Sequence, residues 1–119
     1  PRLKVCFAHG TGESGFLSLV APKPGSWADH LRELMLRFPG VYADMAFHTG
    51  MVNAQAKYKA GVSRLLETPL RRRLLFGSDT PLHAGDYSYK TLIDSARKSV
   101  PGLSTLLVSN AKDFLTGAV

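Results

Sequence analysis

The chain has 119 residues, 45% of them hydrophobic, which is the size of one domain with a modest core. Its longest uncharged apolar stretch, residues 15–22, is far below the roughly 18 residues that a membrane-spanning helix needs, and no basic segment leads into an apolar signal region. The formal net charge is +6, but apart from residues 71–73 the basic side chains are scattered and no aromatic residues are interleaved with them, which argues against nucleic-acid binding.

Three short apolar runs recur along the chain with helical stretches between them, at residues 3–8, 41–47 and 74–77. That alternation is typical of parallel strands joined by crossover helices. Each run ends in a polar or glycine-rich segment, and parallel α/β folds build their sites at those strand ends. The sequence therefore predicts an α/β protein of about three βα units, forming one domain over residues 1–119.

Amphipathic segments lie between and after these runs. Ser26 is a candidate N-cap for a first helix that Pro39 ends, and a second helix is expected over about residues 53–67, with Pro69 beyond it. A third helix follows the last apolar run, and Ser109 is the candidate N-cap of a fourth. The residues expected to share one helix face are Trp27, Leu31, Leu34, Met35 and Phe38 in the first, Tyr58, Val62, Leu65 and Leu66 in the second, Tyr89, Ile93 and Ala96 in the third, and Ala111, Phe114 and Leu115 in the fourth.

Two residues at strand ends can carry chemistry. His9 directly follows the first apolar run, where an imidazole can act as acid, base or metal ligand, and the glycines after it allow a ligand to approach the backbone. Asp79 follows the third run, where a carboxylate can bind a divalent ion or take a proton from water. Asp79 before a turn can equally be a simple turn residue, so the spacing alone leaves both roles open.

Other polar residues have weaker assignments. Period-two alternation places Asp44 and His48 on one face of the second strand, with Asp44 either catalytic or accepting hydrogen bonds within the fold. His48 and His83 are predicted to line a substrate pocket, while His30 is expected to be exposed on the first helix. Cys6 lies in an apolar run and is read as a small buried hydrophobe; as the one cysteine it favours a reducing compartment, and we expect a cytoplasmic protein.

Two familiar motifs lack their required context. The GxGxxG spacing of residues 10–15 follows a strand, but Pro22 and Pro24 cut short the helix that would hold a dinucleotide pyrophosphate. Residues 9–12 are similar to the oxyanion loop of α/β-hydrolases, which requires a GxSxG nucleophile elbow downstream. Ser78 cannot form that elbow, because Thr80 stands two positions after it, where the motif has its second glycine.

Four motifs in order resemble the last third of the amidohydrolase-related proteins, the group that includes aminocarboxymuconate semialdehyde decarboxylase. They are LKVCFAHG at residues 3–10, RFPGVYAD at 37–44, LLFGSDTP at 74–81, and Asn110-Ala111 leading into Phe114-Leu115. The resemblance implies that the three strands are the sixth to eighth of a (β/α)8 TIM barrel with its site at the strand C-termini. Thr11 departs from the commoner Gly-Gly-Gly after the histidine, so the resemblance does not extend to the shape of that loop.

The resemblance also implies roles. His9 matches the sixth-strand histidine, which is a general acid or base in decarboxylases and can bind a second metal ion in other branches. Asp79 matches the eighth-strand aspartate, which ligates a divalent metal, expected to be zinc, and takes a proton from the attacking water. The family's first-strand His-x-His pair and fifth-strand histidine have no counterpart here, so the chain is expected to hold metal weakly and to be inactive in isolation.

The leading hypothesis is metal-dependent hydrolysis of an amide, ester or lactone by the parent protein, with metal-activated water as nucleophile. Nonoxidative decarboxylation of an unsaturated or aromatic carboxylic acid is the alternative, and a noncatalytic α/β scaffold or binding module is the third. The expected partners are a small-molecule substrate and either a second copy or the missing barrel segment, because three strands leave unpaired edges and an uncovered apolar face.

Overall fold

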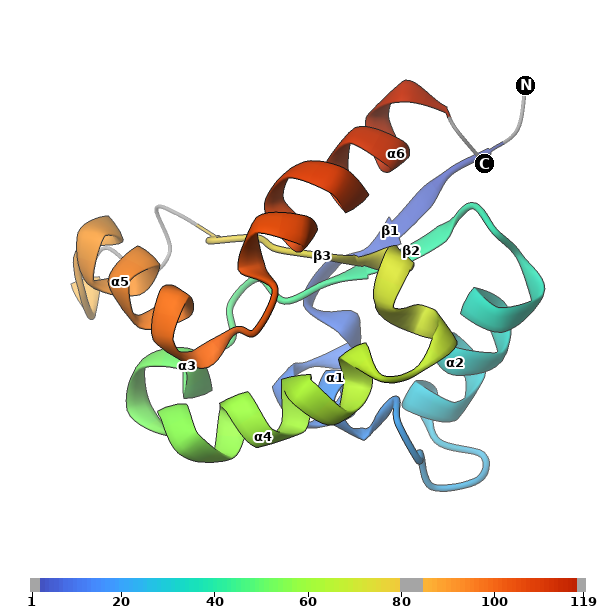
Figure 1. Cartoon of the computed structure of the whole chain (residues 1–119). Coiled ribbons are helices and arrows are strands. Elements are labelled where there is room, and N and C mark those ends of the chain that lie inside the picture. Colours follow the sequence, from blue (N-terminus) through green and yellow to red (C-terminus); the bar gives the residue numbers. More distant parts are fainter. Residues whose placement is uncertain (1–2, 80–84, 118–119) are drawn as a thin grey trace.

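The computed structural model describes residues 3–79 and 85–117 and contains a parallel three-stranded sheet of order β1-β2-β3 (Figure 1). The strands are β1 (Val5–Phe7), β2 (Val41–Asp44) and β3 (Leu74–Leu75). Phe7 pairs with Ala43, and Ala43 pairs in turn with Leu74. The prediction of parallel strands joined by helical crossovers is confirmed, although each strand is shorter than the apolar run that marks it.

Helices fill the crossovers and the C-terminal part of the described chain. They are η1 (Ala8–Thr11), α1 (Glu13–Ser18), α2 (Trp27–Arg37), α3 (Gly50–Asn53), α4 (Gln55–Leu66), η2 (Pro69–Arg73), α5 (Tyr89–Ser99), η4 (Thr105–Asn110) and α6 (Ala111–Thr116). The Ser26 side chain accepts a hydrogen bond from the Asp29 amide at 3.2 Å, so the predicted cap of α2 is confirmed. Ser109 as a cap is wrong: it lies inside the π-helical turn η4, because the chain is already helical from residue 103, after Gly102 turns it with φ of 66°.

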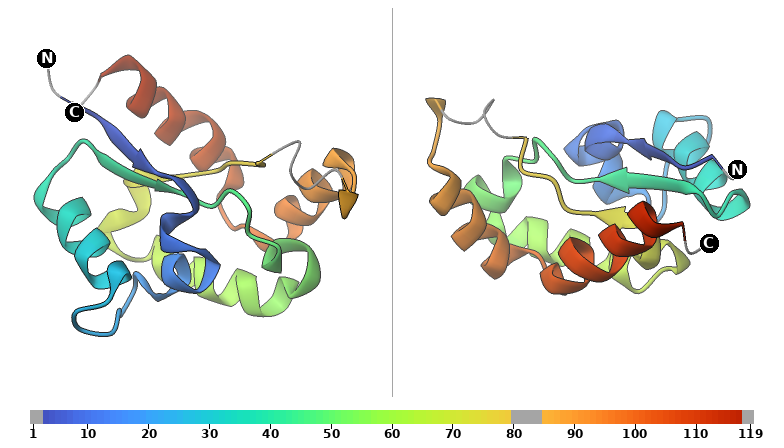
Figure 2. Two further views of the ribbon diagram at one scale, coloured as in Figure 1. Left: turned by 180° about the vertical axis from the view of Figure 1, so that it is seen from behind. Right: turned by 90° about the horizontal axis from the view of Figure 1, so that it is seen from above.

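The sheet carries helices on both faces (Figures 1 and 2). Ala43 and Met45 are fully buried in a core shared with α2, α4 and α5. Tyr42 points to the opposite face, since side chains alternate along a strand, and there its ring meets Phe114 of α6 edge-on at 5.0 Å. The crossover helices therefore cover one face, while α6 covers part of the other.

The C-terminal helix is fastened to the beginnings of the strands. The Lys4 ammonium donates to the carbonyl oxygens of Asp113 and, at 2.9 Å, of Phe114. The buried Asn110 amide donates to the carbonyls of Arg71 and Leu74, each at 2.7 Å. These bonds join the first strand, the third strand and the last helix of the described chain.

Some predicted core positions are exposed. Trp27 is 82% exposed and Tyr89 is 59% exposed, and each is the first residue of its helix, beyond the edge of the core. Leu34 and Phe38 are also partly exposed, while Leu31 and Met35 are buried as predicted. His30 is exposed, as expected. In the described chain no helix combines the length and apolar character needed to cross a bilayer.

Candidate functional site at the carboxyl edge of the sheet

His9 lies in the turn η1 directly after β1, in a left-handed backbone conformation with φ of 61°. Its amide donates to the Asp44 carboxylate at 2.9 Å, and its ring Nδ1 lies 3.0 Å from the Ala46 carbonyl. Left-handed backbone is costly for a residue with a Cβ, so it persists where the surroundings hold it. His9 is therefore fixed by contacts from the loop that follows β2.

The tautomer of His9 follows from its partner. A carbonyl oxygen only accepts hydrogen bonds, so Nδ1 must carry the proton that it donates to Ala46. In the neutral ring Nε2 then holds a free lone pair, which is the state that a metal ligand or general base requires. The backbone carbonyl behind Nδ1 is also the kind of partner that orients metal-binding histidines.

Asp44 joins the two loops beneath His9. One carboxylate oxygen accepts from the amides of His9 and Ala46, at 2.9 and 3.0 Å, and the other accepts from the Cys6 thiol at 3.6 Å. Of the two roles left open by the sequence, this geometry favours the structural one. Burial and the neighbouring Asp44 carboxylate raise the pKa of Cys6 to about 12, which opposes nucleophilic reactivity. The thiol is only partly buried and bonds to a carboxylate, so it is not the fully buried hydrophobe that the sequence predicts.

His48 is buried and 1% exposed, with both ring nitrogens bonded within the protein. Nε2 lies 3.1 Å from the His9 carbonyl, so it donates there, and Nδ1 accepts from the Tyr58 hydroxyl at 2.8 Å. Burial lowers the pKa of His48, which keeps the ring neutral. The predicted substrate contact of His48 stays a prediction; in this geometry the ring supports the backbone of His9.

The shared strand face predicted for Asp44 and His48 is wrong. The strand β2 ends at Asp44, and Phe47 turns the chain with φ of 58°, so period-two alternation does not reach residue 48. Tyr58 and Glu13 are supporting residues that the sequence patterns did not predict. A tyrosine on the core face of a helix needs a partner for its hydroxyl, which is the signal that points to Tyr58. Glu13 accepts from the Gly50 amide at 2.8 Å and gave no such signal.

Asp79 leaves the same edge of the sheet after β3, again in a left-handed conformation with φ of 54°. Its Oδ2 atom is buried and has no hydrogen-bond partner within the described residues. A buried carboxylate oxygen is expensive to leave unpaired, and such an atom in a native fold marks a place for a proton, an ion or a ligand. His83 lies outside the described residues, so its predicted role stays a prediction.

The sheet order separates the two candidate residues by one strand. The strands β1 and β3 flank β2 and run parallel, so His9 and Asp79 emerge at the same edge, on strands about 10 Å apart at the usual spacing of neighbours. Across residues 3–79 and 85–117 no group of three or more His, Cys, Asp or Glu side chains is arranged to hold a metal ion.

The donor set nevertheless fits a divalent metal. Within the described part of the chain, the Asp79 Oδ2 atom and the His9 Nε2 lone pair have no hydrogen-bond partner, and they are oxygen and nitrogen donors of the kind that zinc accepts. A complete site needs at least one further protein ligand. The residues present therefore suit part of a metal site rather than the whole of one.

Comparison with known proteins places this arrangement in a family. A model of the family described as amidohydrolase matches residues 1–115. Neither the curated proteins nor the solved structures contain a significant match to the chain. Three parallel strands with crossover helices are consistent with part of the barrel of an amidohydrolase domain. Because the match extends over nearly the whole sequence, the chain belongs to the amidohydrolase family.

Proposed function

We propose that this chain forms part of the active site of a metal-dependent hydrolase that cleaves an amide, ester or lactone in a small-molecule substrate. The observation that carries the proposal is the buried Oδ2 of Asp79 at the carboxyl edge of β3, which has no hydrogen-bond partner among residues 3–79 and 85–117. Membership of the amidohydrolase family supports hydrolytic chemistry at that edge. A cytoplasmic location belongs to the same proposal and is supported by the lone cysteine.

Asp79 has two tasks in this proposal. Its carboxylate holds the divalent metal, which we expect to be zinc, and it receives the proton that the attacking water gives up. The metal, when bound, supplies a Lewis acid that lowers the pKa of water towards neutrality. Burial of Oδ2 favours the first task, because a buried carboxylate oxygen is costly to leave without a partner.

His9 supplies the second donor. Its Nε2 lone pair is free because Nδ1–H is bonded to Ala46, and the bonds from Asp44 and His48 set the position of its backbone. The ring can therefore bind the metal or carry a proton to the leaving group without first changing tautomer. Phe47 meets the ring edge-on at 5.9 Å and limits its rotation.

Metal content of the full-length protein that carries this chain tests the proposal. We expect Asp79→Asn to lower metal affinity by at least about tenfold, because an amide oxygen is a weaker ligand than a carboxylate and cannot take the proton. The measurement is metal per protein by inductively coupled plasma mass spectrometry after dialysis against a weak chelator. The matched control is Asp86→Asn, which neutralises an exposed carboxylate further along the chain.

Equal metal content in wild-type protein and Asp79→Asn would contradict the ligand role. Product analysis separates the reaction classes, because hydrolysis of an amide, ester or lactone releases no gas. Release of one carbon dioxide per molecule of a carboxylic acid substrate would contradict hydrolysis and support decarboxylation as the reaction.

A further inference from the structure

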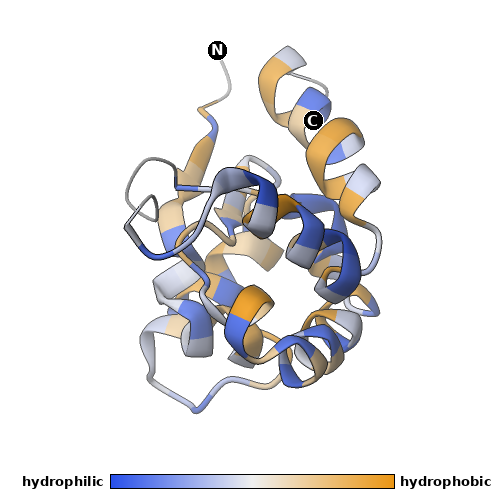
Figure 3. Cartoon of the chain, turned by 90° about the vertical axis from the view of Figure 1, so that its left-hand side faces the viewer, coloured by the Kyte–Doolittle hydropathy of each residue, from blue (hydrophilic) through white to orange (hydrophobic). Residues whose placement is uncertain are grey.

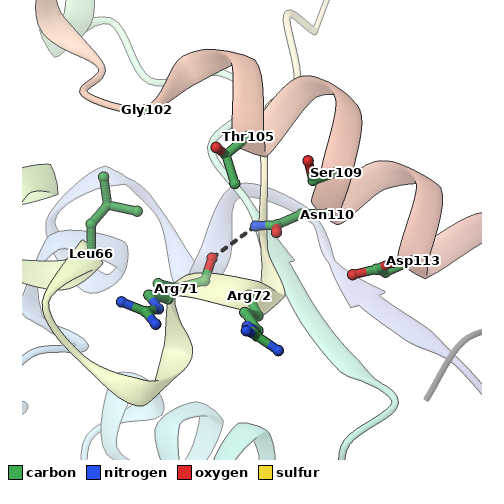
Figure 4. Close-up of a pocket in the computed structure, with 8 residues that line it drawn as sticks. All are labelled: Leu66, Arg71, Arg72, Gly102, Thr105, Ser109, Asn110 and Asp113. Atoms are coloured by element: carbon green, nitrogen blue, oxygen red, sulfur yellow. Dashed lines mark hydrogen bonds between the residues drawn. The ribbon is translucent and has the colours of Figure 1, made fainter.

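A cavity of about 610 Å³ lies where β3 begins, at the end of the sheet opposite to His9 and Asp79. Figure 4 shows it between η2, which carries Arg71 and Arg72, and the C-terminal helix, which carries Thr105 and Ser109. None of these side chains belongs to the candidate site at the carboxyl edge. The cavity is therefore a separate feature of the molecule.

The basic wall of this cavity is formed by Arg71 and Arg72 of η2. Hydrogen bonds hold the backbone of this wall in place, while its two guanidinium groups make no bond to the described residues. Thr68 caps η2 by accepting from the Leu70 amide at 3.2 Å, and Asn110 holds the Arg71 carbonyl at 2.7 Å. Within residues 3–79 and 85–117 the guanidinium groups of Arg71 and Arg72 make no hydrogen bond and no ion pair. The N–H groups of both guanidinium groups can therefore donate hydrogen bonds to a ligand.

The facing wall offers neutral donors. Thr105 and Ser109 are four residues apart in the π-helical turn η4, so their hydroxyls lie close to the same side of the helix. Leu106 and Asn110 of the same turn are buried and hold it against the sheet. The guanidinium donors of η2, with the polar residues Thr105 and Ser109 on the facing wall, form a lining that suits an oxyanion.

From this lining we propose that the cavity binds a small phosphate-bearing molecule. Guanidinium groups match the geometry of phosphate oxygens with paired hydrogen bonds. The volume of about 610 Å³ is within the range of small-molecule sites and leaves room for an organic group beside the phosphate. The proposal does not depend on the hydrolase assignment.

Asp113 also lines the cavity and gives the proposal a directional test. Its carboxylate repels an anion, so its removal strengthens the binding of phosphate. The same change would weaken the binding of an amine or a metal cation. The direction of the effect of Asp113→Asn thus distinguishes an anion site from a cation site.

The test is a titration of the ¹⁵N-labelled chain with inorganic pyrophosphate at constant ionic strength, followed by amide and arginine side-chain resonances. We expect saturable shifts confined to η2 and η4. Arg71→Gln and Arg72→Gln should each raise the Kd by at least about fivefold, because each removes a charge-assisted hydrogen bond. Asp113→Asn should lower it.

Lys59→Gln is the matched control, since it removes one positive charge from the exposed face of α4, away from the cavity. It should change the Kd by less than about twofold, as expected for a screened, distant charge. Circular dichroism verifies that each variant is folded. Shifts spread over the whole surface, equal weakening by Lys59→Gln, weaker binding by Asp113→Asn, or no saturation at tens of millimolar would each overturn the proposal.

Discussion

At the scale of single residues, the position of His9 depends on side chains that have no catalytic assignment. Asp44 accepts from its amide, His48 donates to its carbonyl, and Ala46 accepts from its ring. A left-handed non-glycine residue costs about 1–3 kcal/mol, and these bonds offset that cost. The orientation of the imidazole is thus a property of both strand-end loops together.

Removing the Tyr58 hydroxyl tests the inner end of this network. In Tyr58→Phe the buried Nδ1 of His48 loses its donor, so we expect a loss of about 1–3 kcal/mol in the free energy of unfolding. Urea denaturation followed by circular dichroism measures it. Tyr89→Phe is the control, because Tyr89 is 59% exposed and should lose less than about 0.5 kcal/mol. Equal losses of unfolding free energy in the two variants would show that the hydrogen bond from Tyr58 to His48 does not stabilise the fold.

Cys6 should resist alkylation in the native protein. Only the thiolate reacts, and with a pKa raised to about 12 by burial and by Asp44 the thiol stays protonated through neutral and mildly alkaline pH. We expect iodoacetamide at pH 8 to react at least about a hundredfold more slowly than with a free cysteine. Mass spectrometry over time measures the rate.

Two comparisons check the cause of this protection. Reactivity should return in urea, and Asp44→Asn should accelerate the native reaction, because it removes the carboxylate that opposes ionisation. A native rate equal to that in urea would contradict the assigned environment.

At the scale of elements, the sequence predicted which segments form strands and helices better than where they end. The apolar run at 74–77 yields only Leu74–Leu75 as strand, because pairing with β2 stops where β2 ends. Helical periodicity identified the stripe containing Leu31 and Met35, but it contains no information on how far the core extends, so Trp27 was misplaced.

In the candidate site, too, the sequence predicted some features and not others. Strand-end position was enough to single out His9 and Asp79, whose emergence from one edge follows from parallel topology. The left-handed turns at His9, Phe47 and Asp79 were not predictable, because non-glycine residues adopt them under the force of long-range contacts. The bond from Tyr58 to His48 joins elements that only the tertiary fold brings together.

Asn110 is the element-scale anchor, since one side chain ties the last helix to η2 and β3. Asn110→Ala removes two hydrogen bonds and leaves a cavity, for which we expect about 2–4 kcal/mol of lost stability. Asn53→Ala is the control, as an exposed asparagine near the end of α3. Thermal and urea denaturation compare the two variants. A change within about 0.5 kcal/mol for Asn110→Ala would refute the anchoring role.

At the scale of the whole molecule, hydrophobic residues recur along β1 and the C-terminal helix (Figure 3), and several of them are exposed. Leu3 is 82% exposed, Leu115 is 80% exposed, and Val5 and Phe7 are each more than a third exposed. The strand β1 is an edge of the three-stranded sheet, so one side of its backbone has no strand partner in the described chain. Unpaired apolar edges of this kind are templates for association.

We therefore expect the isolated chain to associate with itself through the edge of β1. Phe7→Lys places a charge on that edge and should shift the chain towards monomer in sedimentation velocity over a tenfold range of protein concentration. The control is Trp27→Lys, which removes a more exposed aromatic residue from α2 and should leave association unchanged. If both variants reduce association equally, general surface hydrophobicity explains it, and edge pairing does not. If the wild-type chain is monomeric at every concentration, the unpaired edge of β1 does not drive association, and the prediction is wrong.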